Sequence, residues 1–237
     1  MKNDIDLKAI AGMIDHSLLH PTVTDADIKS GCNTAVEYGV ASVCVKPYSI
    51  EMAHKIVSGT PVAVCAVIGF PHGNSVTEIK VAETLNAIKK GASEIDMVVN
   101  VGKVLSGEWD FVQREISYCN MTCEKNGAIL KVIFETDYLK DDHIVKLCEI
   151  CSEIKPAFVK TSTGYGFVKK QNGDYNYHGA TEHNVRLMKE HCAPGIKIKA
   201  AGGIRTLDDL LKFKALGVSR IGATATKDIM EEAKKII

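Results

Sequence analysis

Charged residues interrupt several apolar segments of this sequence. Lys160 lies in FVKTSTGYG, Lys199 in IKIKAAGGIR, Asp15 in MIDHSLL and Asp96 in EIDMVVN. A lysine is protonated at neutral pH because its ordinary pKa is about 10.4, but burial beside a second ammonium group lowers that pKa and frees the amine to attack a carbonyl. The residues therefore indicate either a Schiff-base site, in which Asp96 moves a proton, or a phosphate held by two lysines.

The segments that carry these residues alternate with segments of helical spacing. Ile28, Cys32 and Ala35, for example, fall on one face of a helix. Capping-box pairs are expected to begin three helices: Thr24 with Asp27, Ser75 with Glu78, and Thr206 with Asp209. The expected strands are short and rich in β-branched residues: 12–18, 41–45, 62–68, 93–99, 129–135, 157–160, 196–200 and 219–223.

Strands and helices in this alternation fit two architectures, a (β/α)8 barrel and a doubly wound open sheet. An open sheet would carry a G-x-G-x-x-G or Walker turn after an early strand, and the sequence has neither. Its glycines cluster late, at Gly202, Gly203 and Gly222, where barrels commonly bind phosphate. We therefore predict an α/β protein in which residues 1–237 form a single (β/α)8 TIM-barrel domain. Lys160, Lys199 and both aspartates are expected near the carboxyl ends of its strands.

The overall composition disfavours several classes of partner. The 237 residues contain 29 Lys plus Arg and 29 Asp plus Glu, so the formal net charge is zero and no broad basic field is expected for nucleic acid or an anionic membrane. No apolar run reaches membrane-spanning length, and MKNDIDLKAI lacks the apolar core of a signal peptide. We expect a cytoplasmic protein that binds neither nucleic acid nor membrane.

Eight cysteines allow a disulfide or a metal interpretation. Disulfides are disfavoured in a chain without a secretory signal. Cys119 and Cys123, and likewise Cys148 and Cys151, have spacings compatible with zinc, but both pairs fall on apolar helical stripes. Because a free thiol packs as a small apolar side chain, we expect core cysteines rather than a metal centre.

Residues 164–178 (GYGFVKKQNGDYNYH) break the alternation. The segment is long and polar, shows no clear period, and precedes a helix expected to begin near Ala180. Long loops in compact domains often line or cover a site, and a surface insertion without such a role is an equal alternative.

Eight motifs span nearly the whole chain in order: IDHSLL, SVCVKP, IGFPHG, EIDMVVN, LKVIFET, VKTSTGYG, KAAGGIR and RIGAT. This ordered set resembles the deoxyribose-phosphate aldolases, a family of class I (Schiff-base) aldolases with a (β/α)8 barrel. By that resemblance Lys160 is the Schiff-base lysine, Lys199 perturbs it, and Asp96 belongs to a proton relay with a bound water. Asp15 and Cys44 match positions that line the family's site.

The resemblance implies the reversible cleavage of 2-deoxy-D-ribose 5-phosphate into acetaldehyde and D-glyceraldehyde 3-phosphate, a step of carbohydrate degradation. It implies a lyase that needs no metal or organic cofactor. The expected partner is a small phosphorylated sugar, and a homodimer is an assembly open to the chain.

A phosphate site is expected beside the lysines. Gly202 and Gly203 allow backbone N–H groups to approach an anion closely, and the helix after Thr206 would add its positive end. The expected cradle is completed after the last strand and after Lys160 by Gly222, Thr163 and Gly164. The family usually has a serine pair after RxGA or RxGT, whereas Thr224 and Ala225 stand here. Backbone N–H groups survive that change, so we expect phosphate binding to be weakened at most.

Alternatives to this reaction stay open. A Schiff-base aldolase of the same barrel type, acting on another phosphorylated carbonyl compound, is favoured by the long loop and by Thr224–Ala225. A catalytically silent sugar-phosphate-binding protein is disfavoured, because binding alone does not require a nucleophilic amine. A metal-dependent hydrolase is disfavoured because the eight histidines form neither His-x-His at a strand end nor His-Glu-x-x-His. His16 is instead expected to hydrogen-bond within the core.

Overall fold

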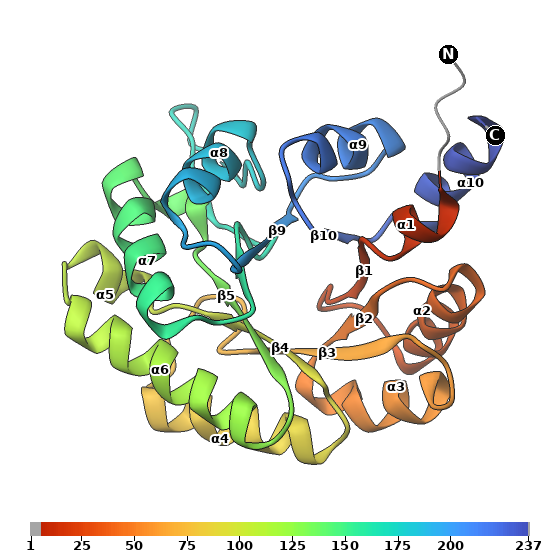
Figure 1. The fold of residues 1–237 in the computed structure, drawn as a ribbon, viewed down its shortest axis with the longest axis horizontal. Coiled ribbons are helices and arrows are strands. Elements are labelled where there is room, and N and C mark those ends of the chain that lie inside the picture. The colour runs from red at the N-terminus through yellow and green to blue at the C-terminus, as the bar shows by residue number, and fades with distance from the viewer. Residues whose placement is uncertain (1–5, 237) are drawn as a thin grey trace.

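The computed structural model describes residues 6–236. The N-terminal MKNDI, part of the segment expected to lack a signal-peptide core, lies outside the described residues, as does Ile237. Figure 1 shows a ring of strands surrounded by helices, and the ring is a closed barrel. The predicted (β/α)8 barrel is therefore confirmed. Among the described helices, none is both long and apolar enough to cross a membrane.

The barrel strands are all parallel and pair in the closed order β1-β10-β9-β6-β5-β4-β3-β2. Each lies within one of the expected segments or overlaps it to within a residue. Their bounds are β1 Ile14–Leu18, β2 Ser42–Val45, β3 Ala63–Ile68, β4 Glu94–Val98, β5 Ile129–Ile133, β6 Phe158–Lys160, β9 Lys197–Ala201 and β10 Arg220–Ala223. Most strand residues are buried, as expected where helices cover the outer face of a parallel sheet.

Helices fill the connections between strands and form the outer layer (Figure 1). Their bounds are α1 Leu7–Ala11, α2 Asp25–Tyr38, α3 Ile50–Val57, α4 Thr77–Lys89, α5 Val101–Leu105, α6 Trp109–Lys125, α7 Asp141–Ile154, α8 Glu182–His191, α9 Leu207–Ala215 and α10 Thr226–Ile236, with short 3-10 turns η1 Pro47–Ser49 and η2 Thr136–Tyr138. The first and last strands pair directly, with Asp15 opposite Gly222, and α1 packs beside α10.

Two of the three expected capping boxes are confirmed. Thr24 with Asp27 begins α2, and Thr206 with Asp209 begins α9. The prediction for Ser75 is wrong, because the extended residue before α4 is Val76, which places Ser75 one position too early to cap the helix.

The long segment 164–178 contains a small antiparallel hairpin, β7 Val168–Lys169 and β8 Tyr175–Asn176, which the sequence did not predict. Exposed aromatic rings of Phe167 and Tyr175 stack at its base, with centroids 4.0 Å apart. Asp137 holds the end of the segment by accepting hydrogen bonds from the backbone N–H groups of His178 and Gly179. Helix α8 then begins at Glu182, close to the expected position.

The cysteines are core residues, as predicted. Seven of the eight thiols are buried and the eighth, Cys192, is half-buried. Cys119, Cys123, Cys148 and Cys151 all belong to the main hydrophobic cluster between the barrel and its helices.

A fully buried ion pair ties two outer helices to the barrel. Lys80 of α4 lies 2.6 Å from Glu115 of α6, and both side chains are inaccessible to solvent. Lys80 also donates to the carbonyl oxygen of Val98 at the end of β4, and Glu115 accepts from the N–H of Asn100 just beyond it. Burial lowers the pKa of Lys80 and raises that of Glu115, so each charge depends on its partner.

We therefore expect Glu115→Gln to lower the free energy of unfolding by roughly 3–5 kcal/mol, because it leaves the Lys80 ammonium buried without a counter-charge. Urea unfolding monitored by circular dichroism measures this loss. Glu149→Gln, which breaks the exposed Lys146–Glu149 pair on α7, should change stability little. Equal effects of the two substitutions would contradict the assigned importance of the buried pair.

Candidate active site

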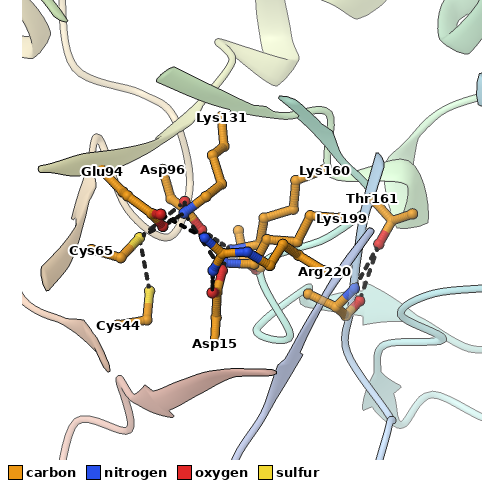
Figure 2. A network of polar contacts seen from close by, with 12 residues as sticks. Asp15, Cys44, Cys65, Glu94, Asp96, Lys131, Lys160, Thr161, Lys199 and Arg220 are labelled. Atoms are coloured by element: carbon orange, nitrogen blue, oxygen red, sulfur yellow. Dashed lines mark hydrogen bonds and ion pairs between the residues drawn. The ribbon is translucent and has the colours of Figure 1, made fainter. Parts of the chain in front are cut away.

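Strand register brings three of the predicted charged residues, and Lys131 with them, together inside the barrel. Lys160 of β6 is the direct neighbour of Lys199 on β9, and Asp96 of β4 is the direct neighbour of Lys131 on β5. All four side chains are almost inaccessible to solvent. Figure 2 shows these side chains converging from separate strands on one region of the interior.

The expected position of these residues at strand ends is correct for Lys160, the last residue of β6. It is wrong for Asp15, Asp96 and Lys199, which lie within β1, β4 and β9. Barrel strands tilt and stagger, so residues at different positions along their own strands reach one depth of the barrel.

The carboxylate of Asp96 is the meeting point of the cluster. Its Oδ2 accepts from the Nζ of Lys160 at 2.7 Å and from the Nζ of Lys199 at 2.8 Å. Its Oδ1 accepts from the Nζ of Lys131 at 2.9 Å and from the Sγ of Cys65 at 3.1 Å. Asp96 thus fixes three lysines at once.

Asp15 connects the lysines around Asp96 to residues on two neighbouring strands. Its Oδ2 lies 2.5 Å from the Nζ of Lys199, and its Oδ1 contacts the guanidinium of Arg220 and accepts from Ser42. Arg220, on β10, also contacts Glu94 of β4 at 2.6 Å. The predicted placement of Asp15 beside the lysines agrees with this geometry.

Lys131, Glu94 and Arg220 were not predicted as site residues from the sequence. Lys131 lies 2.6 Å from Glu94 and is fully buried. The signal that singled out Lys160, a lysine inside an apolar segment, was also present at Lys131 in LKVIFET. Glu94 and Arg220 stand at the first position of their strands, where the sequence does not distinguish an inward side chain from an exposed one.

The charges of the cluster hold most of its groups ionised. Burial opposes the charge on Asp96, but Lys131, Lys160 and Lys199 outweigh it and hold the pKa of Asp96 well below its ordinary value. Burial likewise opposes the charge on Lys199, and Asp15 and Asp96 outweigh it and raise the pKa of Lys199. The pKa of Lys131 is raised against burial in the same way, chiefly by the same two carboxylates.

Apart from Lys160, the cluster contains equal numbers of carboxylates and cations. The three carboxylates are Asp15, Glu94 and Asp96, and the three cations are Lys131, Lys199 and Arg220. Because this set is balanced, Lys160 can lose its proton or become a neutral adduct without leaving a buried carboxylate uncompensated. Removing the charge of any other member would unbalance it.

A cavity of about 500 Å³ opens above the cluster. Its wall contains most of the predicted site residues: Asp15, Cys44, Lys160, Thr163, Gly164, Lys199, Gly202, Gly203, Gly222 and Thr224. The other two predicted site residues, Asp96 and Ala225, are not among the described residues that line the cavity. Asp96 lies beneath it and acts on the cavity through the two lysines. The hairpin segment contributes Phe167, Tyr175 and Asn176 to the wall, so the long loop lines the site.

The glycines after β9 form a close backbone crossing. Gly202 and Gly203 have φ angles of 92° and 83°, which favour glycine. A Cβ on Gly202 would lie 2.8 Å from the Cα of Gly179, so a side chain is excluded there. Arg205, two residues further on, also lines the cavity. Arg205 ends the motif KAAGGIR, of which only the lysine and the glycines were predicted as site residues.

Two expectations for the phosphate cradle need correction. The N–H groups of Arg205 and Thr206 donate to Asp209, and the N–H of Leu207 donates to Glu232, so carboxylates already occupy the positive end of α9. Gly222 lies within β10 rather than after it.

Thr163 also differs from its expected role. Its backbone N–H donates to Glu135 Oε1 at 3.1 Å, and its hydroxyl contacts Glu135 Oε2. The Oγ1 atom in turn accepts from the N–H of Tyr165. Thr163 therefore shapes the loop after Lys160, with Glu135 as its support, and its own donors are occupied.

Glu135 is a buried carboxyl with an unusual environment. Its φ of 58° is left-handed, and burial raises its pKa to about 7 despite the hydrogen bonds from Thr163. A carboxyl whose pKa is 4.5 in the unfolded chain and about 7 in the folded protein takes up a proton on folding between these values. Its contribution to stability is full below pH 4.5 and is lost as the pH rises through about 7.

We expect Glu135→Gln to reduce this dependence, since glutamine keeps the acceptor oxygen and carries no charge. The variant should gain up to about 3 kcal/mol relative to the parent protein between pH 5 and pH 8, measured by urea unfolding at each pH. Glu37→Gln, at an exposed position, provides the control. Parallel stability curves for parent and Glu135→Gln would contradict this assignment.

The contacts of the histidines and thiols are relevant to the alternative of a metal-dependent hydrolase. His16 forms a buried hydrogen bond with Thr226 Oγ1 at 2.7 Å, as predicted, and burial lowers its pKa to about 4. Within residues 6–236, the side chains close enough to share a metal ion are Cys44, Cys65 and Asp96. Three ammonium groups already surround Asp96, which disfavours a further cation there.

Comparison with known proteins agrees with this geometry. A family model described as DeoC/LacD family aldolase matches residues 9–229. A deoxyribose-phosphate aldolase of Rhodopirellula baltica is 47% identical, covering 98% of this chain and 92% of its own length. The enzyme of that name from Caldanaerobacter subterraneus subsp. tengcongensis is 44% identical, covering 99% and 98%. The tetrameric structure of deoxyribose phosphate aldolase from Aeropyrum pernix has a TM-score of 0.85 at 28% identity, covering 98% and 94%.

Proposed function

The chain belongs to the DeoC/LacD family of aldolases, and from this premise we propose that it is the lyase that reversibly cleaves 2-deoxy-D-ribose 5-phosphate into acetaldehyde and D-glyceraldehyde 3-phosphate. The observation that carries the proposal is the pair Lys160 and Lys199, whose amines share one oxygen of Asp96 at the wall of a cavity. A lysine that forms a Schiff base needs such a cationic neighbour and a site that excludes water.

Lys160 is the nucleophile of the pair. Its amine contacts one carboxylate, whereas Lys199 is held between two and kept cationic by them. A lysine beside a second, permanently charged ammonium group is the arrangement that Schiff-base chemistry uses. Lys160 is also the member of the cluster whose charge is not needed to balance the buried carboxylates.

The amine adds to the C1 aldehyde of the sugar, and the adduct takes up one proton and loses water to give a protonated imine; the final hydrolysis returns that proton. A base removes the proton of the C3 hydroxyl, the C2–C3 bond breaks, and its electron pair moves toward the imine nitrogen. D-Glyceraldehyde 3-phosphate leaves, and an enamine remains on Lys160. Protonation at C2 and hydrolysis then release acetaldehyde and restore the amine.

Asp96 changes its role as the enamine forms. The protonated imine keeps a positive charge on the nitrogen of Lys160, and that charge is lost when the C2–C3 bond breaks, so the carboxylate then loses one of the three lysine charges that lower its pKa. Asp96 thus becomes a better proton acceptor as the C3 hydroxyl gives up its proton, and a bound water carries the proton between Asp96 and the substrate.

The phosphate group lies at the glycine end of the cavity. Gly164, Gly202 and Gly203 line it with backbone, Thr224 adds a hydroxyl, and Arg205 adds a cation. Threonine and arginine supply the donors that a phosphate dianion needs, so the absence of the family's usual serine pair does not remove the site. The relatives named as deoxyribose-phosphate aldolases do not favour a different phosphorylated substrate or a silent binding protein.

Three further expectations remain predictions: a homodimer, a cytoplasmic location, and a single domain across residues 1–237. The reaction proposed here requires only the cavity of one chain.

Borohydride trapping tests the nucleophile. We expect incubation with 2-deoxyribose 5-phosphate and borohydride to leave a reduced two-carbon adduct on Lys160, located by digestion and mass spectrometry. Lys160→Arg keeps the contact with Asp96 but cannot form an imine, so both the adduct and the cleavage activity should disappear. Retained cleavage in this variant, or an adduct on another lysine, would overturn the assignment.

The pH dependence of turnover tests Lys199. Lys199→Leu removes the permanent cation beside the nucleophile, and a lysine without such a neighbour attacks a carbonyl as its neutral amine mainly at alkaline pH. We expect severely reduced kcat at neutral pH and relative recovery at alkaline pH. Lys197→Leu removes the same charge from an exposed position of the same strand and should leave the profile unchanged. A wild-type pH profile in Lys199→Leu would refute this role.

A further inference from the structure

Two thiols face each other across adjacent barrel strands. Cys44 of β2 and Cys65 of β3 are direct partners in the strand register, and both side chains are buried. Their sulfur atoms lie 3.6 Å apart. Figure 2 shows them side by side at the edge of the charged cluster, with Cys65 between Cys44 and the group formed by Asp96 and Lys131.

The two thiols have different access to solvent and different partners. Cys44 belongs to the wall of the cavity although it is only 2% exposed, so a small molecule that enters the cavity meets this residue rather than Cys65. Cys65 lies behind it, donates to Asp96 at 3.1 Å and accepts from the Nζ of Lys131 at 3.2 Å. The mechanism proposed above uses neither sulfur.

We propose that Cys44 and Cys65 form an oxidative modification site, at which hydrogen peroxide converts the pair into a disulfide inside the barrel. Neighbouring strands lie about 4.8 Å apart, within the Cα separation of about 4.4–6.8 Å that a disulfide requires. The sulfur atoms need to approach by about 1.5 Å to reach the bonded length. Rotation of the two side chains supplies part of this movement, since both already point at each other.

Cys44 reacts first because it is the accessible sulfur. The hydrogen bond between the thiols lowers the pKa of Cys44, against burial and the charge of Asp96, which raise it. Its thiolate attacks one oxygen of hydrogen peroxide and breaks the O–O bond, which gives a sulfenic acid and hydroxide. The proton released by Cys44 turns that hydroxide into water.

Cys65 completes the reaction. Its sulfur attacks the sulfur of the sulfenic acid, the S–O bond breaks, and the departing hydroxyl takes the proton of Cys65 and leaves as a second water. Two thiols and one hydrogen peroxide thus give one disulfide and two waters, with the thiols oxidised and the peroxide reduced.

The modification acts on the charged cluster through Cys65. Oxidation removes the thiol proton that this residue donates to Asp96, and the movement of its sulfur disturbs the contact with Lys131. It also reshapes the cavity wall at Cys44. We therefore expect the oxidised protein to lose aldolase activity and to regain it with dithiothreitol, an expectation that rests on the proposed function.

Peptide mapping tests the disulfide without reference to activity. The protein is treated with hydrogen peroxide, its remaining thiols are alkylated under denaturing conditions, and tryptic peptides are analysed without reduction. We expect residues 30–55, which contain Cys44, to be joined to residues 56–80, which contain Cys65. Because Cys32 is also in the first peptide, fragmentation must place the bond at Cys44.

Two variants control the experiment. Cys192→Ser removes the other close thiol pair, Cys148 with Cys192, and should keep both the 44–65 bond and the loss of activity that dithiothreitol reverses. Cys65→Ala should abolish the bond. In this variant Cys44 should oxidise past sulfenic acid to sulfinic acid, which dithiothreitol does not reduce. Sulfinic acid at Cys44 without a bond in the parent protein, or a bond only at Cys148–Cys192, would overturn the proposal. If the bond forms in a protein without aldolase activity, the proposal stands and the proposed function fails.

Discussion

One carboxylate, that of Asp96, holds three lysines in the interior of this barrel. A buried ammonium group is costly unless a counter-charge lies close, and here a single side chain provides that charge to three strands at once. The amines cannot move apart without losing it, so like charges remain adjacent at equilibrium. The reactivity of Lys160 and the permanent charge of Lys199 are two results of this one arrangement.

The surrounding charged residues reduce the electrostatic cost of burying these groups. Arg220 contacts Asp15 on one side and Glu94 on the other, and Lys131 bridges Glu94 to Asp96. Each carboxylate therefore has at least two cationic contacts, and most of the cations have two carboxylates. Neutralising Lys160 during a reaction removes the one cation beyond the three that balance the carboxylates, whereas neutralising any other member leaves the buried charges unbalanced. The architecture thus selects which lysine can react.

The sequence was sufficient to predict the barrel and the three central residues, because a charge inside an apolar strand is costly enough to require a reason. It did not reveal that Lys160 and Lys199 are direct neighbours, since register depends on pairing between distant strands. The phosphate-binding residues were predicted less well for a related reason. Thr163 and the start of α9 are good anion ligands in isolation, but Glu135 and Glu232 compete for their N–H groups from remote segments. Local patterns do not show such competition.

The pairing of β1 with β10 has a consequence for the chain while the ribosome is still synthesising it. During synthesis the first strand has only β2 as a neighbour until residues 220–223 leave the ribosome. Until then both borders of the growing sheet expose unpaired backbone, and Asp15 lacks the guanidinium of Arg220. The nascent polypeptide therefore passes through nearly its entire translation with an open sheet, and the last barrel strand to emerge both closes the sheet and completes the cationic partners of Asp15.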